Sequence, residues 1–184
     1  MKKVFVAAIA LAAGLSFAQG TPKVDGTIGA KEYANTYAHK DSGITLNWTI
    51  VGDTIYFGIE SPATGWTGIG FNPTGSKKEG GDMYMFLFEG GKLVARDETM
   101  ERATGAPKQD TEVGGKNDIL AAAGTATAKG MVIEWSRKLD TKDKADEPIL
   151  AGKSNKVLLA YADDASFTKA HKRGDRWEIE IVLK

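Results

Sequence analysis

Residues 44–59 read ITLNWTIVGDTIYFGI, and this stretch decides the fold class. Before the central Gly52-Asp53 pair, apolar residues occupy every second position, at Ile44, Leu46, Trp48 and Ile50. After that pair the same alternation returns, at Ile55, Phe57 and Ile59. Successive side chains of a strand point to opposite faces, and a Gly-Asp pair suits a tight turn. These residues therefore predict a β-hairpin with one apolar face.

Short runs of the same kind continue along the chain, separated by clusters of Gly, Asn, Asp and Pro. Further strands are expected at 66–71, 82–88, 92–97, 118–127, 131–136, 157–162 and 176–183. Polar loops are expected at 99–117, 137–148 and 163–174, the last with one helical turn around 166–172. The pattern predicts a single all-β domain of about ten strands, as in an antiparallel sandwich or barrel.

The strand expected at 82–88 is unusual because it is apolar on both faces. Met83, Met85 and Leu87 alternate with three aromatic residues, and a strand without a polar face is normally covered on both sides. One face would meet the core of the domain, and the other needs a loop or a bound ligand as its cover. Gly68 and Gly70 in the preceding strand also indicate the close approach of a backbone or a ligand.

The first 18 residues have the features of a cleavable secretory signal. Met1-Lys2-Lys3 is a short basic start, residues 4–15 are apolar or small, and Ala18 closes a small-residue cleavage site. The apolar run falls short of the roughly 20 residues that span a bilayer, so a retained anchor is the weaker alternative. We expect cleavage after Ala18, a mature domain at 19–184 without a membrane span, and a periplasmic or secreted location.

Composition excludes several classes of function. The chain has 24 basic and 24 acidic residues, a balance that gives no electrostatic reason to expect nucleic acid as a partner. It contains no cysteine, which removes disulfides, thiolate metal sites, cysteine nucleophiles and covalent haem attachment. Only His39 and His171 could serve chemistry that needs an imidazole. No serine-hydrolase, nucleotide-binding or paired-carboxylate motif is present, so the chain is not expected to be an enzyme.

A series of short motifs follows a known pattern along the mature chain. They begin with Trp66-Thr67-Gly68-Ile69-Gly70-Phe71-Asn72-Pro73 and Gly80-Gly81-Asp82-Met83. They continue through Asp97, Pro107, Asp110, Gly114-Gly115, Ile133, Arg137-Lys138-Leu139-Asp140-Thr141, Asp143, Asp146 and Leu159-Ala160-Tyr161-Ala162, and end at Phe167, His171 and Gly174. Together these motifs resemble the DOMON family, and the resemblance covers nearly all of the mature chain, from about Val24 to the C-terminus. That family includes the N-terminal domain of dopamine β-monooxygenase and the cytochrome domain of cellobiose dehydrogenase. The resemblance implies an immunoglobulin-like sandwich that binds haem b or a sugar.

For haem, the resemblance implies one His and one Met as axial ligands of the iron. His171 occupies the family's histidine position, in the loop before the last strand. The family's methionine position falls on Lys78, and lysine ligates iron only as the neutral amine, so burial would have to lower its pKa. Met83 and Met85 are nearby thioether alternatives, although strand methionines more often pack in a core. Two protein ligands would leave electron transfer with a redox partner as the expected activity.

Two other classes of function remain open. A carbohydrate or small-ligand module would present aromatic platforms, for which Trp66 and Trp135 are candidates if they are not core residues. An adaptor domain would bind only protein and carry no cofactor. Asp140, Asp143 and Asp146 lack the spacing of a calcium loop and are interleaved with lysines, which favours a solvated loop. His39, ahead of the hairpin, is also expected to be solvated.

Overall fold

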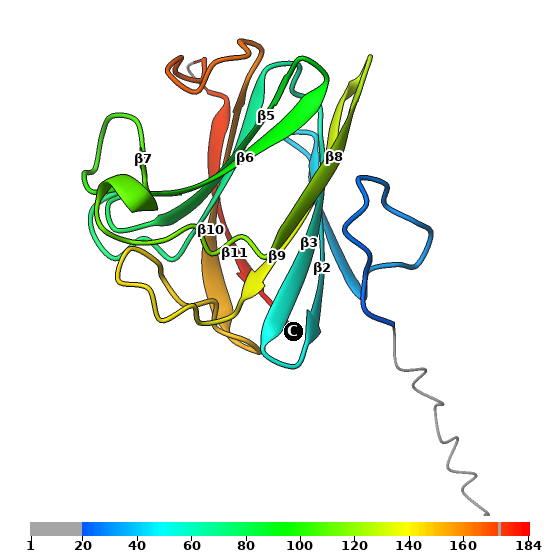
Figure 1. Ribbon diagram of the computed structural model, residues 1–184, viewed down its shortest axis with the longest axis horizontal. Coiled ribbons are helices and arrows are strands. Elements are labelled where there is room, and N and C mark those ends of the chain that lie inside the picture. Colours follow the sequence, from blue (N-terminus) through cyan, green and yellow to red (C-terminus); the bar gives the residue numbers. More distant parts are fainter. Residues whose placement is uncertain (1–19, 173) are drawn as a thin grey trace, which may run out of the picture.

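The computed structural model describes residues 20–172 and 174–184, which form two antiparallel sheets packed face to face (Figure 1). One sheet has the order β1 (Asn35–His39), β2 (Ile44–Val51), β3 (Thr54–Ser61), β9 (Gly130–Lys138) and β8 (Ala121–Thr127). The other has the order β11 (Arg176–Val182), β10 (Ser154–Ala162), β4 (Trp66–Phe71), β5 (Asp82–Glu89), β6 (Lys92–Thr99) and β7 (Lys108–Gln109). The predicted antiparallel β-sandwich is confirmed.

The predicted strands are confirmed with small shifts of their ends. The hairpin of β2 and β3 pairs Ile50 with Ile55 across the turn, where Gly52 adopts a positive φ of 62°. The structure adds β1 and the two-residue β7, which are too short or too polar to stand out in the sequence. The helical turn expected around 166–172 is wrong, because the described residues there form hydrogen-bonded turns, such as Lys169 N–H to the Ser166 carbonyl at 3.1 Å.

The core between the sheets is built around an aromatic stack. Trp135 of β9 stacks on Phe57 of β3 with ring centroids 4.7 Å apart and meets Phe86 of β5 at 5.0 Å. Phe71 of β4 completes the contact with Phe57 at 5.2 Å. All four side chains are fully buried, and each aromatic pair adds about 0.5–1.5 kcal/mol to the free energy of area burial. This stack joins the two sheets.

The outer face of the six-stranded sheet carries a second, smaller apolar cluster. Its buried members are Trp66, Met85, Leu87 and Ala162, which come from β4, β5 and β10. The prediction that β5 is covered on both faces is therefore confirmed, with Tyr84 and Phe86 turned to the core. This outer cluster is the support of the candidate site.

Where the chain is described, no helix is long and apolar enough to cross a membrane. The predicted signal at residues 1–18 lies outside the described residues, and so does the start of the predicted mature domain.

Candidate functional site

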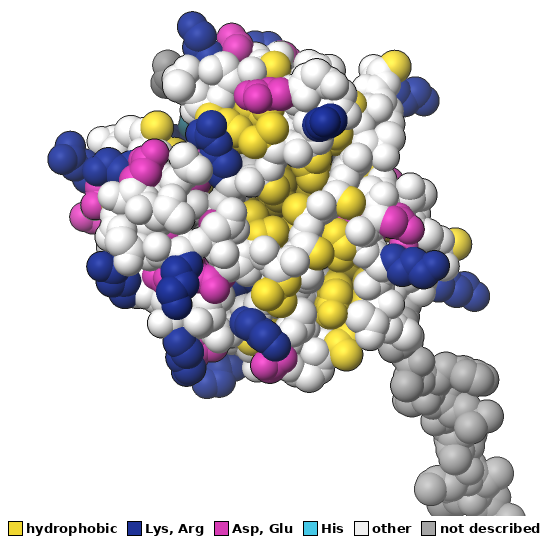
Figure 2. All heavy atoms as spheres, in the orientation of Figure 1, with side chains coloured by type: hydrophobic (Ala, Val, Ile, Leu, Met, Phe, Trp, Pro, Cys, Tyr) yellow, Lys and Arg dark blue, Asp and Glu magenta, His cyan; other side chains and the backbone are white. Residues whose placement is uncertain are grey.

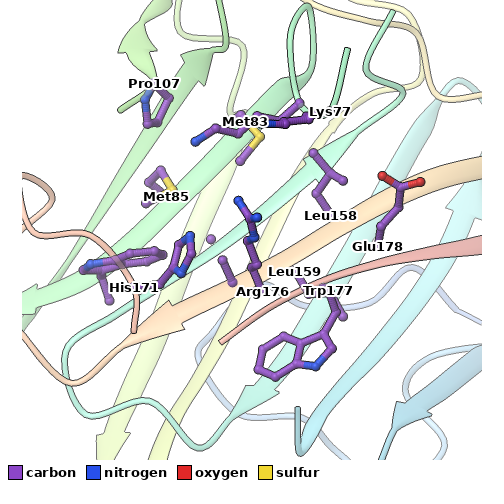
Figure 3. A pocket seen from close by; sticks show the side chains of 14 residues that line it. Lys77, Met83, Met85, Pro107, Leu158, Leu159, His171, Arg176, Trp177 and Glu178 are labelled. Carbon is purple, nitrogen blue, oxygen red and sulfur yellow. The ribbon is translucent and has the colours of Figure 1, made fainter. Parts of the chain in front are cut away.

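A cavity of about 330 Å³ opens on the outer face of the six-stranded sheet. Strands β4, β5, β10 and β11 form its floor, and side chains from the loops at 72–81, 100–107 and 163–175 form its walls. Figure 3 shows Met83, Met85, His171 and Arg176 arranged around the same space. The outer face of β5 was expected to need a loop or a ligand as its cover. In the structure this face is covered partly by loops and partly borders the open space of the cavity.

The floor of the cavity follows from the register of four neighbouring strands. One row across the sheet runs from Met85 through Gly68 and Ala160 to Arg176. The next row on the same face runs from Met83 through Gly70 and Leu158 to Glu178. In both rows β4 contributes only a glycine, and the longer side chains come from the other strands.

The two glycines make room for the methionine sulfurs. A Cβ on Gly68 would lie 2.6 Å from Met85 Sδ, and a Cβ on Gly70 would lie 2.3 Å from Met83 Sδ. Neither distance is sterically possible, so a larger residue at position 68 or 70 would displace the side chain of the facing methionine. The prediction of close approach at these glycines is confirmed, and the close groups are the thioethers of β5.

His171 lies in the wall of the cavity, half-buried, on the loop that joins β10 to β11. Its Nδ1 is 2.8 Å from the Lys172 carbonyl oxygen. A carbonyl only accepts a hydrogen bond, so Nδ1 carries the proton and Nε2 keeps a free lone pair in the neutral ring. The imidazole is therefore in the tautomer that a metal ligand needs, oriented by its other nitrogen.

The loop that carries His171 is tied to the sheet at several points. The indole nitrogen of Trp66 donates to the Lys169 carbonyl at 2.9 Å, and Lys172 pairs with Asp163 at 2.6 Å. The backbone N–H of Tyr161 donates to the Asp175 carbonyl at 3.3 Å. Trp66 thus has two roles, because its ring supports the outer cluster and its polar edge holds the loop.

Lys78 reaches the cavity from the loop after β4, and its Nζ donates to the Gly105 carbonyl at 2.7 Å. Burial, and to a smaller degree the positive charge of Arg176, lowers the pKa of this amine. The lowered pKa favours the neutral amine, while the hydrogen bond to Gly105 uses the amine as a donor. A neutral amine binds iron through its lone pair and keeps two N–H donors, so the bond to Gly105 does not exclude Lys78 as a ligand.

All four predicted site residues, His171, Lys78, Met83 and Met85, line this one cavity. Three further charged residues line it and were not among the predicted site residues: Lys77, Arg176 and Glu178. Arg176 and Glu178 alternate with Trp177 and Ile179 in β11. This period-2 spacing was a sequence signal that the two charged residues lie on one face of the strand and the two apolar residues on the other. Lys77, Lys78 and Arg176 together against Glu178 give the cavity an excess of positive charge.

Three further sequence interpretations, for Trp135, Trp66 and His39, depend on how deeply each side chain is buried. Trp135 is fully buried and Trp66 is 5% exposed, so neither is an exposed platform for a sugar ring. Both rings pack inside the domain, which was the alternative interpretation. The interpretation of His39 as solvated is wrong, because this residue is half-buried on β1. Its Nδ1 lies 2.9 Å from Ser42 Oγ, and its ring meets Trp177 edge-on at 5.8 Å.

Comparison with known proteins gives a family and a shared architecture. The model of the DOMON domain family matches residues 40–162. A relative from Drosophila melanogaster, MOXD1 homolog 2, is 28% identical over 127 residues, which are 66% of this chain and 16% of that protein. The chain thus spans about a sixth of the length of this relative.

Two solved structures share the sandwich. One is the cytochrome b domain of pyranose dehydrogenase from Coprinopsis cinerea, with a TM-score of 0.52 and 12% identity over 79% of this chain and 80% of that one. The other is the cytochrome domain of cellobiose dehydrogenase from Myriococcum thermophilum, with a TM-score of 0.51 and 13% identity over 82% of this chain and 88% of that one. At such identities the likeness concerns the fold.

Proposed function

The chain belongs to the DOMON domain family, and on this premise we propose that it is a non-catalytic domain that binds haem b and carries electrons. The observation that supports this most directly is the convergence of His171 and two methionines on one apolar cavity. Both structural neighbours are described as cytochrome domains, one of them of the b type, which favours haem over other ligands of the fold. The absence of cysteine makes the attachment non-covalent.

The residues present fit a haem group. The floor is thinned by Gly68 and Gly70, so a flat apolar ring has room that side chains would otherwise fill. His171 offers a free Nε2 lone pair, and soft sulfur ligands stand in the same cavity. Lys77 and Arg176 supply positive charge of the kind that pairs with carboxylates such as the haem propionates.

We propose that His171 would hold the haem iron together with one of Met83, Met85 and Lys78. The buried thioethers of Met83 and Met85 can bind iron without losing a proton, whereas Lys78 must first become the neutral amine. Haem b bound between two protein ligands would supply one-electron chemistry and keep no open coordination position for oxygen. The protein's own contribution is to orient the imidazole, exclude water from the floor and set the charge around the rim.

Electron transfer requires a partner, and we propose a redox protein that meets the domain outside the cytoplasm. The neighbouring cytochrome domains come from dehydrogenases, which motivates a protein partner of this class. The basic and apolar N-terminal sequence supports export, with the mature domain in the periplasm or secreted. A sugar remains the alternative ligand of the fold, but neither tryptophan that could stack on it is exposed.

The decisive experiment is an absorption spectrum of the purified protein supplied with haem b. We expect a Soret band that sharpens and shifts on reduction, and we expect His171→Ala to abolish it. His39→Ala is the matched control, because it removes the only other imidazole of the chain and His39 does not line the cavity. No Soret band in the wild type, or equal bands in the two variants, would disprove the proposal.

The second ligand can be identified with single substitutions at the three candidates. Met83→Leu and Met85→Leu keep the volume but remove the sulfur, and Lys78→Leu removes the amine without supplying a thioether in its place. The variant that lacks the true ligand should lose the low-spin ferric spectrum and at least about tenfold in haem affinity, in line with the loss of a metal-site interaction. The other two should keep the wild-type spectrum.

A further inference from the structure

The four edges of the two sheets are not equally protected against pairing with another chain. In the six-stranded sheet, the edge strand β11 carries charges at alternate positions, Arg176, Glu178 and Glu180, and the opposite edge strand β7 has only two residues. In the five-stranded sheet, the edge strand β1 is held to the C-terminus, because the Asn35 side chain donates to the Lys184 carbonyl at 2.6 Å. Charges, short strands and covering segments are the usual protection of a sheet edge.

The fourth edge strand, β8, has none of these protections. It is seven residues long and reads Ala-Ala-Ala-Gly-Thr-Ala-Thr over 121–127. The run without charge or proline is longer still, from 119 to 128. Among residues 20–172 and 174–184, no strand lies beyond β8 in its sheet. The strand therefore presents an exposed row of backbone N–H and C=O groups, which is a template for a further strand.

The sandwich is also open beside β8. Gly124 faces the other sheet, since a Cβ there would lie 3.1 Å from Phe88 Cζ and 3.4 Å from Leu93 Cδ2. Ala122 and Ala126 lie two positions away on the same face of the strand, and both are exposed. Figure 1 shows the contacting strands β6 and β8 on the viewer's side, and Figure 2 shows a band of hydrophobic side chains across that side. The inner face of β8 is thus only partly covered by its own chain.

We propose that β8 pairs with β8 of a second copy of this chain, so that the two five-stranded sheets become one continuous sheet. The two strands run antiparallel about a two-fold axis, and full overlap of residues 121–127 places Gly124 on that axis. Ala122 of one copy then lies opposite Ala126 of the other. Charge supports the antiparallel arrangement, because the uncharged run begins after Asp118 and ends before Lys129. Each acidic start meets a basic end, whereas parallel strands would bring like charges together.

A second copy suits this edge better than an isolated strand, because it also closes the open side of the sandwich. A two-fold axis perpendicular to the joined sheet keeps both six-stranded sheets on the same side of it. The β6 strands of the two copies then face each other across the join, and Leu93 of each copy helps to cover the alanines of β8. Leu120, which is 56% exposed beside β8, is covered as well.

The join lies away from the haem cavity. The cavity opens on the outer face of the six-stranded sheet, whereas β8 belongs to the other sheet and its inner face meets Phe88 and Leu93. Each copy would therefore bind haem with its own residues. The association of two copies does not rest on the haem proposal, and the absorption spectrum and the mass of the protein in solution test the two separately.

The first test is sedimentation equilibrium of the purified protein without haem over a range of protein concentrations. The weight-average mass should rise from that of one chain toward twice that value, with a dimer Kd on the order of 1–100 μM for a join of modest size. A mass of one chain at every concentration up to about 1 mM would overturn the proposal.

Substitutions at two exposed alanines of β8 test the register. Ala122→Lys combined with Ala126→Lys places lysine opposite lysine twice and should raise the dimer Kd by at least about tenfold. Ala122→Lys combined with Ala126→Glu places opposite charges together twice and should return the Kd to within about threefold of the wild type. Ala38→Lys adds the same charge to an exposed alanine of β1, at the other edge of the sheet, and should leave the Kd unchanged. Equal weakening in the charge-swapped variant, or in Ala38→Lys, would contradict the pairing.

Hydrogen exchange tests the wild-type protein and does not depend on any variant folding. Backbone amides of β8 should exchange at least about tenfold more slowly at a protein concentration where the dimer dominates than at a low one, because their outward N–H groups gain partners. Amides of β11, an edge strand protected by charge, should exchange at the same rate at both concentrations. Exchange in β8 that does not depend on concentration, or an equal change in β11, would count against the join.

Discussion

The two faces of the six-stranded sheet are both apolar, but only the inner one is filled by the chain's own side chains. On the inner face Tyr84 and Phe86 of β5 meet the fully buried Trp135 of the opposite sheet. On the outer face Met83 and Met85 of the same strand border a cavity of about 330 Å³ above glycine. The difference indicates that the inner face stabilises the fold and the outer face is shaped for a ligand.

Figure 2 shows one side of the molecule, in the orientation of Figure 1. Charged side chains are distributed over this side, and a band of hydrophobic side chains is visible across its middle.

The largest effect is expected from Phe86→Ala on the inner face. Removal of this fully buried ring leaves a void in the aromatic stack, and the expected loss is about 3–5 kcal/mol of unfolding free energy. Met85→Ala, at the adjacent position on the outer face, is the matched control. It enlarges a cavity that already exists, so its cost should stay below about 2 kcal/mol. Chemical denaturation measures both, and equal losses would show that the outer face is an ordinary core.

An intermediate effect is expected from Gly68→Ala, and it should fall on ligand binding more than on stability. The new Cβ would displace the Met85 thioether, which is the flexible end of a side chain, so the stability should change by less than about 1.5 kcal/mol. Haem affinity should fall by about tenfold or more, because the floor of the cavity is raised. A haem titration measures the change. Unaltered affinity would mean that the ligand does not contact this floor.

The smallest effect is expected from Trp66→Phe, which keeps an aromatic ring but removes the hydrogen bond to the Lys169 carbonyl. The free energy of unfolding should fall by about 0.5–1.5 kcal/mol, the usual worth of one hydrogen bond. Backbone amides of the loop at 163–172 should exchange hydrogen faster, while those of β2 and β3 should not change. Uniform acceleration in both regions would show that Trp66 acts on the whole fold and not on the loop of His171.

Much of the fold could be predicted from the sequence because strand periodicity is local. The alternation in 44–59 gave the expected hairpin of β2 and β3. The glycine-containing run at 66–71 and the run at 82–88, which is apolar on both faces, gave the expected strands β4 and β5. The polar β1 and the two-residue β7 could not be predicted, because they are strands only through pairing with β2 and β6. The candidate ligands and their meeting over the strand at 82–88 could be predicted from the family resemblance, but the charged residues Lys77, Arg176 and Glu178 in the same cavity could not.

By itself, the sequence determined the all-β class, the family and the absence of thiol chemistry, since all three depend on residue types and their local spacing. Only the tertiary structure decided which side chains meet. It placed Arg176 on the floor of the cavity with Met85, and it buried Asp146 beside Asp82, two residues that spacing along the chain does not relate. The physical reason is that burial and charge pairing depend on contacts between strands and loops far apart in sequence, and only the packed sandwich brings these together.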